Sequence, residues 1–151
     1  MISETLNHGA ISYSWVNLKD ISASVPLSVV AAEDANFCNH WGFDLTAIRS
    51  AIEQGSKRGA STLSQQVVKN LFLWHQRSWI RKAFEAVLTP VVEISWPKKR
   101  ILEVYLNIAE FDEGIFGIEE ASQKFFGMSS SKLSLQQAAL LAAVLPNPKK
   151  R

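Results

Sequence analysis

Signals for helix starts recur along this sequence, and they constrain the fold more than any other feature. Thr62 and Ser134 are each followed three residues later by glutamine. This is the spacing of a capping box, in which two side chains satisfy the first backbone N–H groups of a helix. Asp44 and Ser78 are further candidate N-caps, and Pro97 suits the first turn of another helix. Apolar residues follow each start at helical spacing, so the pattern predicts a mainly α fold.

Apolar residues mark most of the predicted helices, as a continuous run in the first and at helical spacing in the others. In chain order, these sets are Leu27–Ala32; Leu45, Ile48 and Ile52; Leu63, Val67 and Leu71; Ile80, Phe84, Val87, Leu88 and Val91; Ile101, Leu102, Tyr105 and Leu106; and Ala138, Leu141, Ala142 and Leu145. The run 27–32 is expected to pack into a core, and the set from 80 to 91 is expected to face one. Pro90 predicts a kink, and a helix over 117–126 should stop at Gly127. Partial alternation over residues 9–21 indicates at most a short extended or β segment near the N-terminus.

Composition places the chain among folded proteins of one domain. Its 151 residues are 47% apolar and 20% charged, which argues against disorder. The net charge of +2 is too small to favour a nucleic-acid partner. The single cysteine, Cys38, excludes an internal disulfide. No apolar run is as long as a membrane span, and residues 1–10 lack the pattern of a signal peptide.

Glu33 and Asp34 directly follow the apolar run 27–32. A carboxylate held at the end of a buried helix can serve as a general base, which takes a proton from a reacting group. Acidic pairs on surfaces commonly do no more than solvate the end of a helix. Both interpretations are open from these two residues alone.

Two basic segments in the middle of the chain favour a local anionic ligand. Lys57 and Arg58 lie in a glycine-bearing loop before the helix that starts at Thr62, which is an arrangement that can hold a phosphate. The loop lacks the Walker spacing, and a solvated loop is the alternative. Farther along, Glu85 lies one helical turn after Arg81. This pair is either a surface ion pair or a carboxylate among cations that bind a leaving pyrophosphate.

Five motifs, in order, resemble those of glycosyltransferase family 51, the peptidoglycan glycosyltransferases. They cover nearly the whole chain from Trp15 onward. The motifs are Glu33-Asp34-x-x-Phe37-x-x-His40-x-Gly42-Phe43-Asp44; Arg58-Gly59-Ala60-Ser61-Thr62-Leu63-Ser64-Gln65-Gln66-x-x-Lys69-Asn70; Arg81-Lys82-x-x-Glu85; Lys99-Arg100-Ile101-Leu102-Glu103-x-Tyr105-Leu106-Asn107; and Ala138-Ala139-Leu140-Leu141-Ala142-Ala143-Val144-Leu145-Pro146-Asn147-Pro148. Within the family, segments 58–61, 71–74 and 107–111 most resemble the monofunctional transglycosylases of Gram-negative bacteria.

The resemblance implies a lysozyme-like helical fold, with residues 1–151 forming a single peptidoglycan glycosyltransferase domain. It implies an inverting enzyme that polymerises lipid II into β-1,4-linked glycan strands and releases undecaprenyl pyrophosphate. Glu33 matches the family's catalytic base, and Glu85 matches its second essential carboxylate. The residues that match substrate-binding positions are Lys69, Arg77, Ser61, Thr62, Gln65, Gln66, Asn70, Arg81, Lys82, Asp34 and His40.

The resemblance also implies partners and a location. The partners are lipid II, a lipid-linked glycan strand, and cell-wall synthesis or division proteins, at the periplasmic face of the bacterial inner membrane. Phe72, Trp74 and Trp79 are candidates for contact with the membrane surface, because amphipathic aromatic side chains favour interfaces; the alternative for each is a place in the core. The resemblance implies no organic cofactor. It allows a divalent metal ion, Mg²⁺ or Mn²⁺, near Glu85. The family's N-terminal anchoring helix and the helix after Pro148 are expected to be missing here.

Two other functional classes are compatible with these residues. A lysozyme-like hydrolase that cleaves glycan uses similar carboxylate chemistry, although it does not need cations around Glu85. The second alternative is a non-catalytic module that binds lipid II or a partner protein. Formation of polymer from lipid II distinguishes the three.

Overall fold

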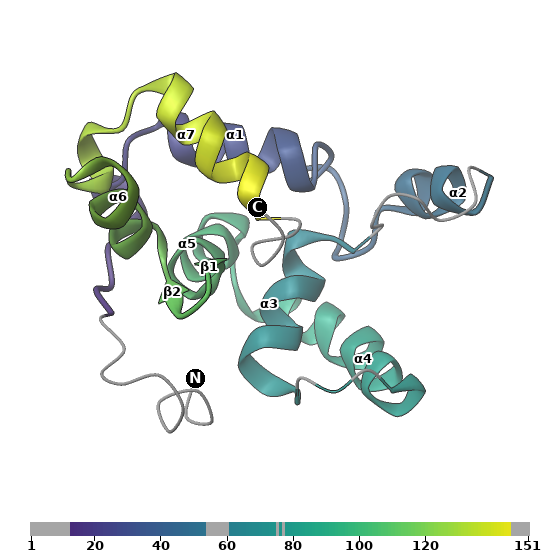
Figure 1. The fold of residues 1–151 in the computed structure, drawn as a ribbon. Coiled ribbons are helices and arrows are strands. Elements are labelled where there is room, and N and C mark those ends of the chain that lie inside the picture. Colours follow the sequence, from purple (N-terminus) through teal and green to yellow (C-terminus); the bar gives the residue numbers. More distant parts are fainter. Residues whose placement is uncertain (1–12, 54–60, 75, 77, 146–151) are drawn as a thin grey trace. The chain divides into compact units, whose positions relative to one another are not determined.

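The computed structural model describes residues 13–53, 61–74, 76 and 78–145. That part of the chain forms seven α-helices, two short 3₁₀ helices (η) and one two-stranded sheet (Figure 1). In chain order, the elements are η1 (Leu18–Asp20), α1 (Ser24–Glu33), α2 (Leu45–Glu53), α3 (Leu63–Phe72), α4 (Trp79–Ser95), α5 (Lys98–Ile108), β1 (Glu110–Asp112), β2 (Ile115–Phe116), α6 (Ile118–Phe126), η2 (Ser130–Lys132) and α7 (Leu135–Val144). The mainly α, lysozyme-like fold class expected from the sequence is confirmed.

The predicted helix starts are also confirmed. Thr62 and Ser134 form complete capping boxes with the glutamines three residues later. Asp44 accepts hydrogen bonds from the backbone N–H groups of Thr46 and Ala47 at the start of α2. Ser78 accepts the backbone N–H of Arg81 at the start of α4. Helix α6 ends at Gly127, which adopts the left-handed conformation.

The chain divides into two compact units, and the boundaries between them fall within α1 and α5. One unit comprises residues 1–29 and 106–151, and the other comprises residues 30–105. The expectation that residues 1–151 form a single domain stays a prediction.

In the first unit, β1 and β2 form an antiparallel hairpin that contacts α6. The unit's core includes Phe111, Ile118, Ala121, Ala138 and Leu141, all almost fully buried. The segment before η1 is joined to the end of α5 through the side chain of Asn107, whose amide exchanges two hydrogen bonds of 2.8 Å with the backbone of Val16. The described residues 13–17 form no strand, and the only strands of the described part, β1 and β2, lie where the sequence analysis expected none.

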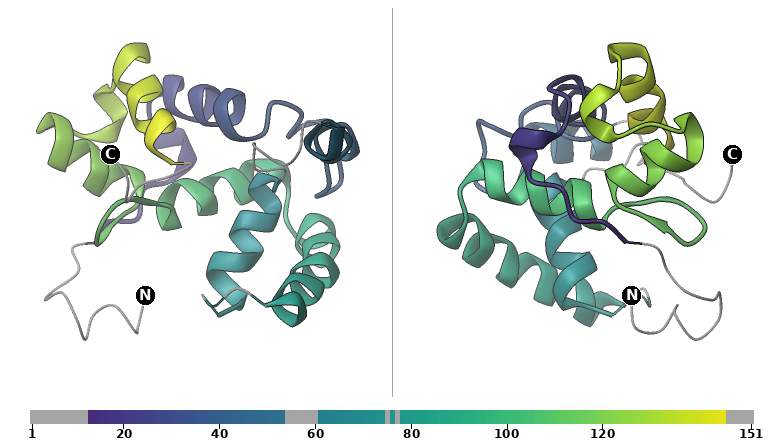
Figure 2. Two further views of the ribbon diagram at one scale, coloured as in Figure 1. Left: turned by 45° about the vertical axis from the view of Figure 1, so that its right-hand side comes forward. Right: turned by 90° about the vertical axis from the view of Figure 1, so that its left-hand side faces the viewer.

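In the second unit, α3 and α4 pack side by side (Figures 1 and 2). Leu63, Val67 and Val68 of α3 are fully buried. The buried residues of α4 are Glu85, Thr89, Val92 and Glu93, so three of the four are polar or charged. No helix of the described residues combines the length and the apolarity needed to cross a bilayer.

The prediction that the apolar residues of α4 face a core is wrong. Ile80 and Val87 are each 67% exposed, and Phe84 and Val91 are at least half exposed. The spacing identifies a continuous apolar face correctly, but α4 packs through its opposite, polar face. The packing of the run 27–32 is also overestimated, because only Val25 and Val29 of α1 are buried. Helix α2 buries no residue at all.

Candidate functional site

Glu33 is the last residue of α1, and its side chain lines a pocket of about 240 Å³. The pocket lies within the second unit. Seven of its lining residues carry a carboxyl or hydroxyl group: Glu33, Asp34, Asp44, Thr46, Ser50, Ser61 and Thr62. Glu33 is half-buried, and its Oε2 accepts a hydrogen bond from Nε2 of Gln66 at 2.8 Å. A wall of hydrogen-bonding oxygens around a carboxylate suits a hydroxyl-rich ligand such as a sugar.

Asp34 is buried, and both of its carboxylate oxygens have protein partners. Oδ1 lies 2.9 Å from Nε2 of His40, and Oδ2 accepts the backbone N–H of Leu63 at 2.9 Å. His40 Nδ1 accepts the backbone N–H of Gly42 at 3.1 Å, which leaves Nε2 as the donor to Asp34. Asp34 therefore joins the segment after α1 to the N-terminus of α3, where a negative charge is favourable. It does more than solvate a helix end, while substrate binding by Asp34 and His40 stays a prediction.

Gly42 lies where two side chains of α4, Thr89 and Glu93, come close. Its φ is +87°, and a Cβ there would lie 2.5 Å from Cγ2 of Thr89 and 3.2 Å from Cγ of Glu93. The carbonyl of Gly42 accepts a hydrogen bond of 2.7 Å from Oγ1 of Thr62, and the capping box joins Thr62 to Gln65. These contacts fix the start of α3. Thr62 and Gln65 are buried, and their predicted contact with substrate stays a prediction.

The remaining predicted residues around α3 are more accessible. Ser61 and Asn70 are exposed, and Gln66 and Lys69 are half-buried. Ser61 lines the pocket beside Glu33. Arg77 lies outside the described residues.

Glu85 lies in α4 with its carboxylate between two cations. Arg81 Nη1 donates to Oε2 at 3.0 Å, and Lys82 Nζ donates to Oε1. Glu85 is only 2% exposed, whereas the side chains of Arg81 and Lys82 are 11% and 46% exposed. The interpretation as a solvated surface pair is therefore wrong for this carboxylate. Two cations held by a buried acid can bind an anion at the surface.

The residues around Glu85 do not fit a divalent metal ion. Mg²⁺ and Mn²⁺ take oxygen ligands, but both oxygens of Glu85 contact cationic groups. Among the described residues, no three His, Cys, Asp or Glu side chains are grouped so that they could hold a metal ion.

Asp44 lines the same pocket as Glu33 and is held ionised by its neighbours. Hydrogen bonds from the side chain of Thr46, the backbone of Ala47 and the side chain of Asn36 lower the pKa of Asp44 from 3.8 to about 2. A charge at this position also stabilises the N-terminus of α2.

Buried polar residues that the sequence analysis did not single out connect the helices of this unit. Glu93 of α4 accepts hydrogen bonds from Oγ of Ser64 and, at 2.7 Å, from Nζ of Lys98. The same ammonium group lies 4.5 Å from the ring centre of Phe37. Tyr105, which the sequence places in an apolar set and in the fourth motif, donates through its hydroxyl to Oε1 of Gln66 at 3.3 Å. Periodicity analysis misses such hydrogen bonds, because it counts a tyrosine in a buried apolar set in the same way as a phenylalanine.

An apolar surface covers the outer side of α4 and the end of α3. On α4, Ile80, Phe84, Val87, Val91 and Ile94 follow one another at spacings of three and four and share a face. The predicted contact residues Phe72, Trp74 and Trp79 are 54%, 44% and 91% exposed, so the alternative of a core position is wrong for them. We call these eight residues the α4 apolar surface.

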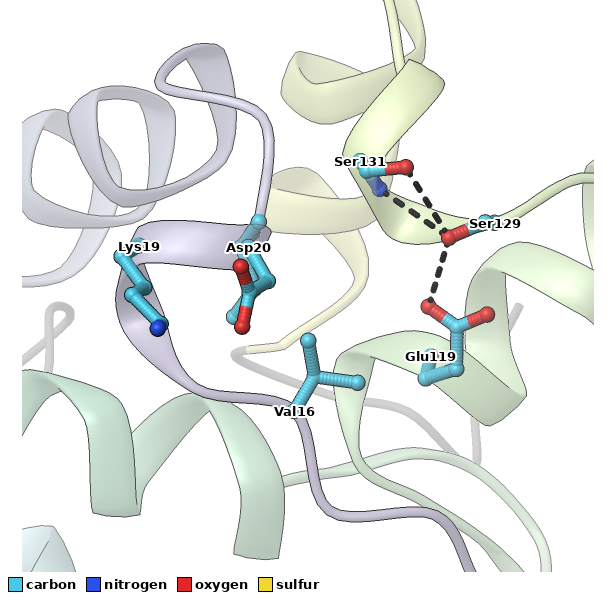
Figure 3. Close-up of a pocket in the computed structure, with 7 residues that line it drawn as sticks. Val16, Lys19, Asp20, Glu119, Ser129 and Ser131 are labelled. Carbon is cyan, nitrogen blue, oxygen red and sulfur yellow. Dashed lines mark hydrogen bonds between the residues drawn. The ribbon is translucent and has the colours of Figure 1, made fainter.

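A second pocket, of about 580 Å³, lies in the first unit and holds none of the predicted site residues (Figure 3). Its wall includes Lys19, Asp20 and Glu119. Burial raises the pKa of Glu119, but hydrogen bonds from Ser130 and Ser129 outweigh it and hold the pKa below its ordinary value. These bonds fasten η2 to α6, so Glu119 has a structural role.

Comparisons with known proteins agree with the family resemblance drawn from the motifs. The family model described as Transglycosylase matches residues 2–151. A protein from Jannaschia sp. (strain CCS1) named "Biosynthetic peptidoglycan transglycosylase" is 59% identical over the whole chain, which covers 63% of that protein. Proteins of the same name from Mannheimia succiniciproducens and Salmonella typhimurium are each 58% identical. They match 91% and 93% of this chain, which covers 58% and 60% of their length. The chain thus spans about 60% of the length of these relatives.

Proposed function

Because the chain belongs to the transglycosylase family, we propose that it is the catalytic part of a peptidoglycan glycosyltransferase that polymerises lipid II into β-1,4-linked strands. The observation that carries the proposal is the position of Glu33, a half-buried carboxylate with one fixed oxygen on the wall of a hydroxyl-lined pocket. Such a carboxylate can take a proton from a sugar hydroxyl bound in the pocket.

The chemistry requires a base. Forming a β-1,4 bond from an α-linked sugar pyrophosphate inverts the anomeric carbon, so the acceptor hydroxyl attacks from the face opposite the leaving group. A sugar hydroxyl is a poor nucleophile, and removal of its proton as the new bond forms contributes about 10²–10⁴ in rate. Glu33 receives that proton, and the bond between the sugar and the pyrophosphate breaks with its electron pair going to the leaving oxygen.

The departing undecaprenyl pyrophosphate is an anion and needs cations rather than a strong acid. Arg81 and Lys82 are held in place by the buried Glu85, and the side chain of Lys82 is 46% exposed to solvent. Lys69 and Arg77 are the further cations of this proposal. Preorganised charges stabilise the charge that develops as the bond breaks, without reorganisation at the moment of reaction. No step is assigned to a metal ion.

Both substrates carry lipid tails, so we place the enzyme on a membrane surface, at the periplasmic face of the inner membrane. The α4 apolar surface supports this placement, because soluble proteins rarely expose so many large apolar side chains together. Trp74 and Trp79 suit the interface between head groups and acyl chains. Cell-wall synthesis or division proteins are the further partners of the proposal.

The test is incubation of the protein with lipid II in detergent, followed by separation of glycan polymer from monomer. We expect polymer from the parent chain and a loss of at least about a hundredfold in turnover for Glu33→Gln. Lipid II binding should change by no more than a few-fold. Glu53→Gln is the matched control, because Glu53 is an exposed residue of α2 that pairs with the likewise exposed Arg49.

The other outcomes separate the alternatives. Binding of lipid II without polymer from the parent chain indicates a binding module. Cleavage of preformed glycan indicates a hydrolase. Near-normal turnover of Glu33→Gln removes the assignment of Glu33 as the base.

A further inference from the structure

Glu33 is the end of a chain of hydrogen bonds that begins in the interior of the second unit. The hydroxyl of Tyr105 donates to Oε1 of Gln66 at 3.3 Å, and Nε2 of Gln66 donates to Oε2 of Glu33 at 2.8 Å. The three side chains come from α5, α3 and α1. Side chains from three helices therefore form one chain of hydrogen bonds, which ends at the carboxylate that the proposed function uses as its base.

The partners at both ends determine which way the Gln66 amide points. An ionised carboxylate can only accept hydrogen bonds, so the NH₂ group must face Glu33. The amide oxygen then faces Tyr105, whose hydroxyl must donate. Burial raises the pKa of Tyr105, and the nearby charge of Glu33 raises it further, so the phenol keeps its proton.

The donor is held rigidly as well as oriented. Tyr105 is 1% exposed and is among the largest fully buried side chains. Gln66 lies in the first turn of α3, whose start is fixed by the Thr62–Gln65 capping box and by the bond from Leu63 N–H to Asp34. A positioned group of this kind costs little further ordering when a substrate binds.

We propose that Gln66 and Tyr105 are positioning residues for Glu33. Tyr105 fixes the Gln66 amide, and the amide holds Oε2 of Glu33. Among the described residues Oε1 of Glu33 has no hydrogen-bond partner, so this oxygen remains for the acceptor hydroxyl. This inference rests on the proposed function, and it gives Gln66 a role toward the base where the family resemblance gave it one toward substrate.

We call the hydrogen bonds from Tyr105 to Gln66 and from Gln66 to Glu33 the relay. The relay predicts a change in the pH dependence of turnover, which a purely structural role of Gln66 and Tyr105 does not. A donated hydrogen bond favours the charged form of a carboxylate. Without it, the acidic limb of the turnover profile should move to higher pH. The variants are Tyr105→Phe, which removes one oxygen, and Gln66→Met, which keeps the length of the side chain but has no N–H group.

The experiment measures kcat and KM for lipid II polymerisation in detergent across pH 4–8, with Tyr13→Phe as the control. Tyr13→Phe removes the same hydroxyl group at an exposed position. We expect kcat to fall about tenfold in both relay variants while KM changes less than threefold. The limb should move up by about half a pH unit or more, and Tyr13→Phe should match the parent.

A second measurement does not depend on turnover. The ¹³C signal of the Glu33 carboxyl, assigned with Glu33→Gln, is followed through an acid titration of the parent and each variant by NMR. A higher midpoint in Tyr105→Phe and Gln66→Met supports the relay even if the chain makes no polymer. Unmoved midpoints with a folded spectrum overturn it. An inactive Glu33→Gln together with unmoved limbs rejects the relay alone, whereas an active Glu33→Gln rejects the proposed function.

Discussion

Substitution of Gly42 by alanine should destabilise the protein through two separable effects. The first is backbone strain, because φ is +87°, and a left-handed conformation costs an L-residue about 1–2 kcal/mol. The second is overlap with Thr89, whose Cγ2 would lie 2.5 Å from the new Cβ, and overpacking typically costs about 1–3 kcal/mol. The sum is about 2–5 kcal/mol, which lowers the Tm of a protein of this size by roughly 4–20 °C.

Alanine substitutions at two other glycines measure the cost of backbone strain without the overlap. Gly114 and Gly127 have φ values of +74° and +64°, and a Cβ at either would meet no atom within 4 Å. Gly114→Ala and Gly127→Ala should therefore cost only about 1–2 kcal/mol. Urea unfolding, followed by far-UV circular dichroism, measures all three free energies.

A double-mutant cycle isolates the overlap. Thr89→Ser removes Cγ2 and keeps Oγ1, which donates to the carbonyl of Glu85 at 2.6 Å. In the Thr89→Ser background, the cost of Gly42→Ala should fall toward that of the two control glycines, although the contact with Cγ of Glu93 at 3.2 Å remains. This fall corresponds to a coupling of about 1–3 kcal/mol. The reasoning is refuted if Gly42→Ala costs no more than the controls, or if Thr89→Ser leaves its cost unchanged.

Three further changes test other parts of the structure. The lowered pKa of Asp44 stabilises the fold above pH of about 4, and this stabilisation is lost as the pH falls from about 4 to about 2. Asp44→Asn should cost about 1–2 kcal/mol at pH 7 and flatten acid unfolding in that window; parallel acid curves would contradict this. Ser134→Ala should cost about 1 kcal/mol through loss of the α7 cap, measured by urea unfolding. Trp79→Ser, at a side chain 91% exposed, should weaken vesicle binding in a flotation assay with an unchanged Tm.

Local sequence signals were sufficient for most helix boundaries. The N-caps at Asp44, Thr62, Ser78 and Ser134 act through side chains that contact the next turn, so neighbouring residues determine them. The β1–β2 hairpin was missed because its strands have only three and two residues, too few for alternation to register.

The burial of α4 could not be predicted from periodicity. The pattern shows that one face of the helix is apolar, but whether protein covers that face depends on tertiary packing. The polar signal was present in Glu85, Thr89 and Glu93 at spacings of four, and it indicated the face that is actually buried. Motif order pointed to Glu33 and Glu85 as candidate site residues, whereas the hydrogen bond from Tyr105 to Gln66 joins residues 39 positions apart and required the structure.

The inverted burial of α4 reverses the usual pattern of mutational tolerance along a helix. Val87 and Ile94 are 67% and 78% exposed, so the described residues around them constrain the shape of their side chains only weakly. In a saturation library, those positions should accept apolar side chains of different sizes and shapes. Glu85 and Glu93, by contrast, are enclosed by specific partners. Sequence divergence among functional variants of α4 should therefore concentrate at its exposed apolar positions, whereas its buried acidic residues should hardly vary.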